Sequence, residues 1–254
     1  MISIVVLLTY IFMVTMNALA NILPINGVGT GEVSAWYPNL FTPAAKTFAV
    51  WGVIYLLLLL YTLYQLKNIK QDSRVDNPLF EQLGRPFAVS SLLNGIWIYA
   101  WHHNQIGWTV LIMICLLGLL IYINYTLKKV SLQGKDICLI KVPFEVYFGW
   151  ITVATIANIT VLLVKLNWNR FGQTEVFWAV LMITLGAMIG AFNIQFYQAP
   201  FYGCVMLWAY GGILAEHMGV SGYRGEYPMV VGATIGGMVI LLVGELLLVR
   251  KKCL

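Results

Sequence analysis

Eight apolar runs, each about as long as a bilayer-crossing helix, alternate with short polar connections along the chain. A hydrocarbon core about 30 Å thick needs roughly 20 helical residues to cross it. The runs cover residues 2–22, 43–66, 86–104, 107–127, 142–164, 175–195, 197–216 and 228–249. Pro43, Pro86, Pro143 and Pro228 stand at the starts of four runs, where a missing N–H costs a helix little. The pattern predicts eight membrane-spanning helices.

The placement of basic residues predicts how these spans are oriented. The first run could also be a signal peptide, because Ala18-Leu19-Ala20 resembles a cleavage site. A retained helix is favoured, because the run is long and no basic residue precedes it. With eight spans, eleven Lys and Arg residues fall on the side of the two termini and four on the other. This excess predicts cytosolic termini, in the plasma (inner) membrane. The polar segment 67–85 is expected along the cytosolic surface, as a loop or short amphipathic piece.

Composition and charge agree with a membrane protein. The 254 residues are 60% hydrophobic and 10% charged, whereas soluble domains have about 45–50% apolar and about 25% charged residues. The net charge of +5 is carried by short basic clusters between the apolar runs. Such clusters are typical of cytosolic membrane loops, so we expect a lipid bilayer and no nucleic acid as partner.

Candidate catalytic chemistry is scarce, whereas deep amides and tryptophans are conspicuous. The sequence has no nucleophile elbow, zinc-binding His-Glu helix, paired-carboxylate motif or phosphate loop, so no catalytic or metal-binding residue is predicted. Five tryptophans fit an aromatic belt at the exported interface: Trp36, Trp101, Trp108, Trp168 and Trp178. The polar and aromatic residues within the spans include Asn94, Asn158, Asn193, Trp51, Trp97, Trp150 and Trp208. They either bridge helices or line a site for a flat, conjugated, apolar ligand.

Two glycine pairs indicate close helix packing. Gly186 and Gly190, and likewise Gly232 and Gly236, stand four residues apart, so each pair shares one helix face. Packing within the monomer is favoured, because eight helices need many contacts. A homodimer seam is the alternative.

Three motifs follow one another along the first five runs. They are Trp36-Tyr37-Pro38-Asn39-Leu40-Phe41-Thr42-Pro43 with Phe48, Trp51 and Tyr55; Leu93-Asn94-Gly95-Ile96-Trp97; and Tyr147, Trp150, Ala154 and Asn158. In their order, and in the spacing of the third motif, they resemble the TspO/MBR family of translocator or tryptophan-rich sensory proteins. In the first motif, the loop between Trp36 and Phe41 is a few residues shorter than in that family, and Phe48 is one residue closer to Trp51. Ala44 departs from that family's second proline. Ile156 replaces the tyrosine of a sterol-type motif, which argues against sterol binding.

The resemblance implies an all-α fold in which residues 1–168 form a TspO-like five-helix transmembrane region. Residues 169–254 would add three transmembrane helices without a counterpart in the five-helix family. Members bind porphyrins (tetrapyrroles) and similar planar hydrophobic ligands, with no obligatory cofactor. Carried over by position, the ligand pocket would be lined by Trp51, Asn94, Trp97, Trp150, Ala154 and Asn158 and covered by Trp36, Tyr37 and Phe41.

The leading hypothesis is therefore a TspO-like membrane protein that binds such a ligand as a sensor, sequestering protein or carrier. Three alternatives stay open at the level of sequence. One is a membrane enzyme that degrades bound porphyrin, the second is a small-molecule transporter, and the third is a scaffold without a ligand. The C-terminal Lys251-Lys252 also fits a dilysine retrieval signal, although it equally serves as a basic anchor after the last span.

Overall fold

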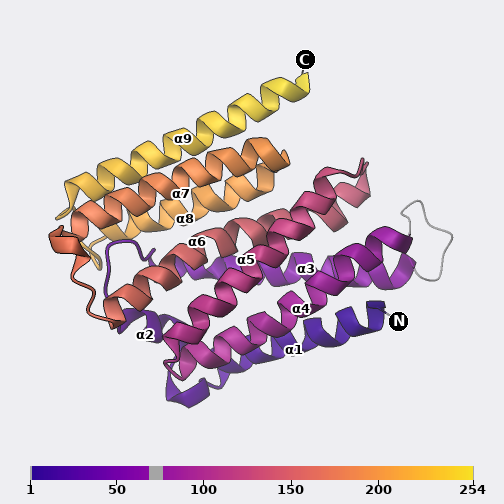
Figure 1. The fold of residues 1–254 in the computed structure, drawn as a ribbon, viewed down its shortest axis with the longest axis horizontal. Helices are drawn as coiled ribbons and strands as arrows, with labels where there is room; N and C mark the ends of the chain where they lie inside the picture. The colour runs from indigo at the N-terminus through magenta and orange to yellow at the C-terminus, as the bar shows by residue number, and fades with distance from the viewer. Residues whose placement is uncertain (1, 69–76, 254) are drawn as a thin grey trace. The chain divides into compact units, whose positions relative to one another are not determined.

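The computed structural model describes residues 2–68 and 77–253, and the regular elements in this part of the chain are all helical (Figure 1). The α-helices are α1 (Ile2–Ile22), α2 (Thr30–Ala35), α3 (Val50–Asn68), α4 (Asn77–His102), α5 (Ile106–Lys128), α6 (Val142–Lys165), α7 (Glu175–Tyr197), α8 (Pro200–Met218) and α9 (Pro228–Cys253). Shorter turns are η1 (Ile25–Gly27), η2 (Ala45–Ala49), the π-helical η3 (Ile137–Lys141) and η4 (Arg170–Gly172). The predicted all-α fold class is confirmed.

Each of the eight predicted runs coincides with one long helix. Six of the helices in the described residues, namely α1, α3, α5, α6, α7 and α9, are long and apolar enough to cross a membrane. Helices α4 and α8 do not meet this criterion, because α4 contains serines and an asparagine and α8 is rich in glycine and tyrosine. Length and composition therefore support six crossings in the described residues, and the predicted number of eight stays a prediction.

The third predicted span lies within a helix that begins earlier than the span. Helix α4 begins at Asn77, nine residues before the predicted start, and Pro86 lies inside it. Pro78 occupies the first turn, where a missing N–H needs no partner. Residues 77–85 of the predicted surface segment 67–85 are thus helical and continue directly into the span, while residues 69–76 lie outside the described part of the chain.

The first two turns of α4 are amphipathic, which explains why the helix starts early. Phe80 and Leu83 are buried, and the Gln65 side chain donates from Nε2 to the Phe80 carbonyl at 3.2 Å. Glu81 and Arg85 face outward and lie 3.7 Å apart. Burying the apolar face offsets the backbone hydrogen bond that the internal proline removes.

Two further boundaries differ from the prediction. The second run begins with the 3₁₀ turn η2, and the α-helix itself starts at Val50. The seventh begins at Pro200 rather than at residue 197, because Gln198 adopts a left-handed conformation (φ 51°) that ends α7. A left-handed residue just after the last turn is a common helix stop.

The described chain forms two compact units. Unit 1 comprises Met1–Ser34 and Trp51–Phe148, and unit 2 comprises Ala35–Val50 and Gly149–Leu254. The predicted division into 1–168 and 169–254 follows family resemblance rather than compactness, and it stays a prediction.

In unit 1, α4 packs along both α1 and α5, and polar side chains tie the helices together. Asn17 Nδ2 donates to Asn94 Oδ1 at 2.8 Å, and Asn94 Nδ2 donates to the Tyr147 hydroxyl at 3.2 Å. Tyr10 in α1 donates to the Tyr55 carbonyl in α3 at 2.9 Å. Hydrogen bonds of this kind satisfy polar groups that have no water in a bilayer.

In unit 2, α7 and α8 both pack against α9 (Figure 1). A Cβ at Gly186 would lie 2.7 Å from the Tyr210 hydroxyl, and one at Gly190 would lie 2.5 Å from Leu241 Cδ2. These glycines permit the close approach of helices within the monomer, as predicted for this pair.

The second glycine pair behaves differently. A Cβ at Gly232 or Gly236 would meet no atom of the described residues within 4 Å. This pair therefore does not serve close packing within the described chain. A homodimer seam at these glycines stays a prediction.

Candidate functional site

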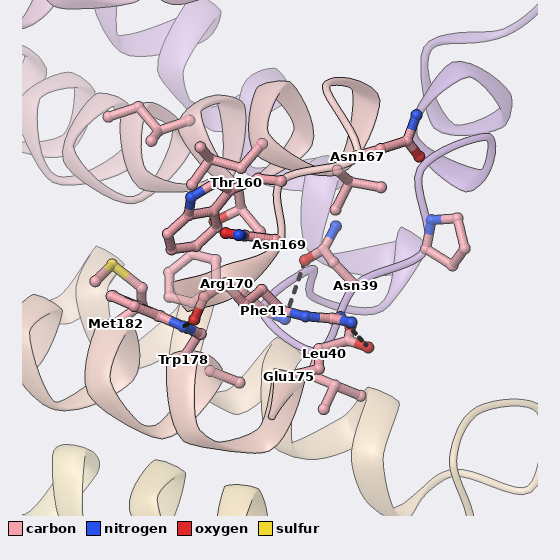
Figure 2. Close-up of a pocket in the computed structure, with 16 residues that line it drawn as sticks. Asn39, Leu40, Phe41, Thr160, Asn167, Asn169, Arg170, Glu175, Trp178 and Met182 are labelled. Atoms are coloured by element: carbon pink, nitrogen blue, oxygen red, sulfur yellow. Dashed lines mark hydrogen bonds and ion pairs between the residues drawn. The ribbon is translucent and has the colours of Figure 1, made fainter. Parts of the chain in front are cut away.

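Unit 2 contains a cavity of about 510 Å³ (Figure 2). Its walls are the loop before η2, the last turns of α6, the α6–α7 connection and the first turns of α7. The lining residues are Pro38, Asn39, Leu40, Phe41, Ile159, Thr160, Leu163, Val164, Asn167, Trp168, Asn169, Arg170, Glu175, Trp178, Ala179 and Met182. Ligand cavities of about 300–1,000 Å³ with mainly apolar walls and a few polar groups are the usual form of small-molecule sites.

The loop wall of the cavity is organised by the Asn39 side chain. Its Oδ1 accepts from the backbone N–H groups of Phe41 and Thr42, both at 3.0 Å. Its Nδ2 donates to the Tyr37 carbonyl and to the Thr42 hydroxyl, both at 2.9 Å. Asparagine stabilises turns by such bonds to its own neighbourhood. Both Asn39 and Phe41 are buried, so the loop presents a fixed surface.

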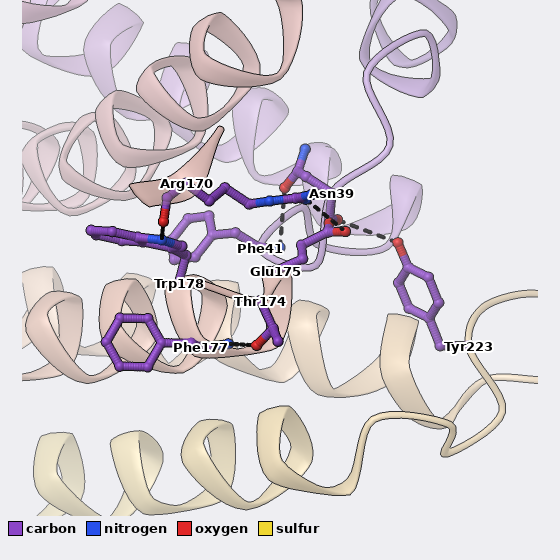
Figure 3. Close-up of polar contacts among 8 residues, drawn as sticks. All are labelled: Asn39, Phe41, Arg170, Thr174, Glu175, Phe177, Trp178 and Tyr223. Carbon is purple, nitrogen blue, oxygen red and sulfur yellow. Dashed lines mark hydrogen bonds and ion pairs between the residues drawn. The ribbon is translucent and has the colours of Figure 1, made fainter. Parts of the chain in front are cut away.

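Helix α8 and the connection after it hold this loop wall in place. The His217 Nε2 lies 2.9 Å from the Leu40 carbonyl oxygen, and it carries the proton because that oxygen can only accept. The Tyr223 hydroxyl donates to the Asn39 carbonyl at 3.4 Å (Figure 3). Burial raises the pKa of this hydroxyl, and the carboxylates of Glu175 and Glu216 raise it further.

Two more hydrogen bonds continue this attachment along the chain. Trp208 Nε1 in α8 donates to the Thr47 carbonyl at 2.9 Å, and the Ala44 N–H donates to the Gly212 carbonyl at 3.0 Å. The residues from the loop wall through η2 are thus fastened to α8 at several backbone positions. The hydrophobic pattern predicts no such role for the C-terminal helices.

The α6–α7 connection is held in an unusual backbone conformation. Arg170, Phe171 and Gly172 all have positive φ angles, of 57°, 52° and 75°. Such values are costly for residues with a Cβ. Asn169 Oδ1 accepts from the Phe171 N–H at 3.1 Å. Trp178 Nε1 donates to the Arg170 carbonyl at 2.9 Å, as Figure 3 shows. These two bonds fix the turn that carries Arg170 toward the cavity.

Aromatic rings gather at this end of the cavity. The rings of Trp168 and Trp178 meet edge to face with centroids 4.8 Å apart. Phe171 lies 5.3 Å from Trp168 and is largely exposed. The sequence pattern predicts an interfacial belt for the two tryptophans, and in the structure they also line a cavity. The clustering of aromatic and amide residues just after the fifth span is the sequence signal that could have indicated this wall.

The predicted ligand-binding residues are distributed over both units, and Phe41 is the one that lines this cavity. Trp51, Asn94 and Trp97 belong to unit 1. Trp51 stacks on Tyr55, with ring centroids 5.4 Å apart, and Trp97 stacks on Trp101 at 5.6 Å. As a ligand pocket, this set of nine stays a prediction.

The other predicted residues belong to unit 2. Trp36, in the covering loop, is about half exposed, and Tyr37 supplies the carbonyl that Asn39 binds. Trp150 is buried and meets Phe48 edge to face at 5.7 Å. Asn158 donates from Nδ2 to the Ala154 carbonyl of its own helix at 2.9 Å. In sequence, Asn158 directly precedes the first α6 residue that lines the cavity.

The cavity also bears on the number of membrane crossings. Its walls join the loop that follows α1 to the connection between α6 and α7, so these two segments lie on the same side of the membrane. An even number of crossings must separate them. Helices α3, α5 and α6 are candidate spans by length and composition, and a crossing by α4 would make their number even.

The same reasoning applies to α8. Tyr223, in the connection after α8, bonds to Asn39 in the cavity loop, so these connections share one side. A crossing by α8 would match that of the candidate span α7. The hydrophobic pattern predicts eight crossings, and beside the six candidate spans of the described residues this number stays a prediction.

Together, the apolar helices and the cavity define a multi-pass α-helical membrane protein whose second unit contains a ligand-sized cavity. A family model described as "TSPO-like protein" matches residues 3–247, and the chain belongs to this family. The match continues through α7, α8 and most of α9, beyond the first 168 residues that carry the motifs. Comparison with curated proteins and with solved structures gave no match to this chain.

Proposed function

We propose that this TSPO-like membrane protein binds a porphyrin or a similar planar, largely apolar ligand, as a sensor, sequestering protein or carrier. The observation that carries the proposal is the cavity of about 510 Å³ in unit 2. Its volume suits a small conjugated molecule, and its walls combine apolar side chains with a few amides. Indole rings such as Trp178 offer a flat face on which a conjugated ring can stack.

We further propose that the cavity opens on the exported side, with both termini cytosolic in the plasma (inner) membrane. The three connections around the cavity follow the first, fifth and seventh spans, and these connections carry few basic residues. The connections on the opposite side carry most of the Lys and Arg, as cytosolic loops do.

A ligand titration in lipid nanodiscs tests binding and locates it. Protoporphyrin IX is titrated into the protein in zwitterionic lipid, and the shift of the ligand's Soret absorbance is followed. Met182→Trp places a larger side chain at the cavity wall. Overfilling a packed site costs about 1–3 kcal/mol, so affinity should fall roughly tenfold. Met188→Trp is the matched control, since Met188 lies on the same helix and is 49% exposed.

A third variant, Trp150→Phe, separates the cavity from the pocket predicted by resemblance. Binding in the cavity should leave the affinity of Trp150→Phe close to that of wild type. If Trp150→Phe weakens binding and Met182→Trp does not, the ligand occupies the predicted pocket instead. Absence of saturable binding in wild type would refute the proposed ligand class altogether.

A further inference from the structure

Two opposite charges stand among the otherwise neutral residues that line the cavity. Within the described chain, Arg170 is the only cationic and Glu175 the only anionic member of the lining. Both side chains are about half exposed, at 49% and 45%. They therefore sit at the mouth of the cavity, where a ligand entering from the membrane surface would meet them.

The contact between these two charges is loose. Arg170 Nη1 lies 3.8 Å from Glu175 Oε2, which is longer than a hydrogen bond. Exposed pairs of this kind stabilise a protein little. A competing anion can therefore replace Glu175 at the Arg170 guanidinium at small cost.

The backbone that carries Arg170 is nevertheless fixed. Its left-handed conformation is held by the bond from Trp178 Nε1 to the Arg170 carbonyl, and the next residue is held by Asn169. Figure 3 shows the Arg170 side chain extending from this turn toward Glu175 and Asn39. A rigid backbone with a weakly engaged guanidinium is an arrangement that suits recognition of an anionic group, because guanidinium and carboxylate can pair through two parallel hydrogen bonds.

We infer that Arg170 selects ligands that carry a carboxylate beside a planar apolar body, and that Glu175 occupies the guanidinium when the cavity is empty. This inference rests on the proposed function, and it adds the chemical class of the ligand. The apolar body lies in the cavity between α6 and α7. The carboxylate takes the place of the Glu175 side chain at Arg170, and Glu175 turns to water.

The test compares an acidic ligand with its neutral ester. Protoporphyrin IX and protoporphyrin IX dimethyl ester are each titrated into the protein in nanodiscs of zwitterionic lipid, with the Soret shift as readout. Arg170→Gln should weaken binding of the diacid about three- to tenfold and leave binding of the ester unchanged. Glu175→Gln should strengthen binding of the diacid by a similar or smaller factor, since it removes the competing carboxylate. Arg224→Gln controls for net charge, because Arg224 is an exposed cation outside the cavity lining.

The possible outcomes distinguish a failure of this inference from a failure of the proposed function. Suppose that both ligands bind and that Met182→Trp weakens the binding of both. If Arg170→Gln then leaves both affinities unchanged, or lowers them equally, the selection for a carboxylate is wrong and the proposed function stands. If the ligands bind but Met182→Trp does not affect their affinity, the ligand lies outside this cavity and the inference is wrong. If neither ligand binds wild type saturably, the proposed function is wrong as well. Displacement of the diacid by added phosphatidylglycerol, lost in Arg170→Gln, would assign Arg170 to lipid headgroups and overturn the inference.

Discussion

Gly212 in α8 faces the chain segment that leads from the cavity wall into α3, and Gly212→Ala should displace that segment. A Cβ at this position would lie 2.1 Å from Thr47 Oγ1, 2.6 Å from its Cγ2 and 2.8 Å from its Cβ. Thr47 is buried and β-branched, so it has few alternative rotamers. Its carbonyl is bound by Trp208, and therefore the backbone must move to relieve the clash.

The neighbouring Gly211 provides the control variant, and the difference in stability between Gly211→Ala and Gly212→Ala gives the cost of the clash. A Cβ at Gly211 would meet no atom of the described residues within 4 Å. Gly211→Ala and Gly212→Ala gain the same helix propensity, about 1 kcal/mol, so this gain cancels when the two variants are compared. The difference between them is the cost of overpacking, about 1–3 kcal/mol. For a chain of this size it corresponds to a difference of roughly 2–12 °C in Tm.

The assay is thermal unfolding of the two purified variants in the same detergent, followed by intrinsic tryptophan fluorescence. Gly212→Ala should unfold at the lower temperature and should bind protoporphyrin IX more weakly, because the cavity loop is attached to the displaced segment. Equal unfolding temperatures, or a lower value for Gly211→Ala, would refute the reasoning that α8 holds this segment by close contact.

Two further predictions concern the connections around the cavity. Burial raises the pKa of the Tyr223 hydroxyl, so its contribution to stability is complete below pH about 10 and is lost as pH rises through the folded-state pKa. The Tm difference between wild type and Tyr223→Phe should therefore shrink above pH 10. A constant difference up to pH 11 would contradict this. The second prediction tests the number of crossings in a chain that lacks its native cysteines. If there are eight crossings, a single cysteine introduced at exposed position 171 or 220 should react with an impermeant maleimide added outside intact cells. Labelling at one position but not at the other would exclude eight crossings.

Much of the helical layout follows from the sequence, because runs of about 20 apolar residues have one stable form in a bilayer. Pro228 begins α9 as predicted, since proline fits the first helical turn. Pro86 does not begin α4, because the residues before it form an amphipathic helix whose burial outweighs a lost hydrogen bond. Hydrophobicity indicates which residues lie in the membrane, whereas it says less about where a helix starts.

Less of the cavity than of the helical layout could be predicted from the sequence. Phe41 is expected in a ligand site and does line the cavity. For Trp168 and Trp178 the sequence predicts a belt, because interfacial position explains a tryptophan near a span end without any contact information. Their convergence with Asn39 depends on a turn with positive φ angles after α6 and on the attachment of a distant loop to α8. Neither feature leaves a periodic signal in the sequence.

These contacts change the interpretation of the three C-terminal helices. The resemblance predicts them as an addition to a five-helix region, yet α7 supplies one wall of the cavity. Helix α8 binds the cavity loop through His217 and the following turn η2 through Trp208. Helix α9 in turn packs along both α7 and α8. Removing these helices would leave the carbonyls of Asn39 and Leu40 without the partners that Tyr223 and His217 supply. The C-terminal helices are therefore part of the structure that forms the candidate site, which agrees with a family match that extends to residue 247.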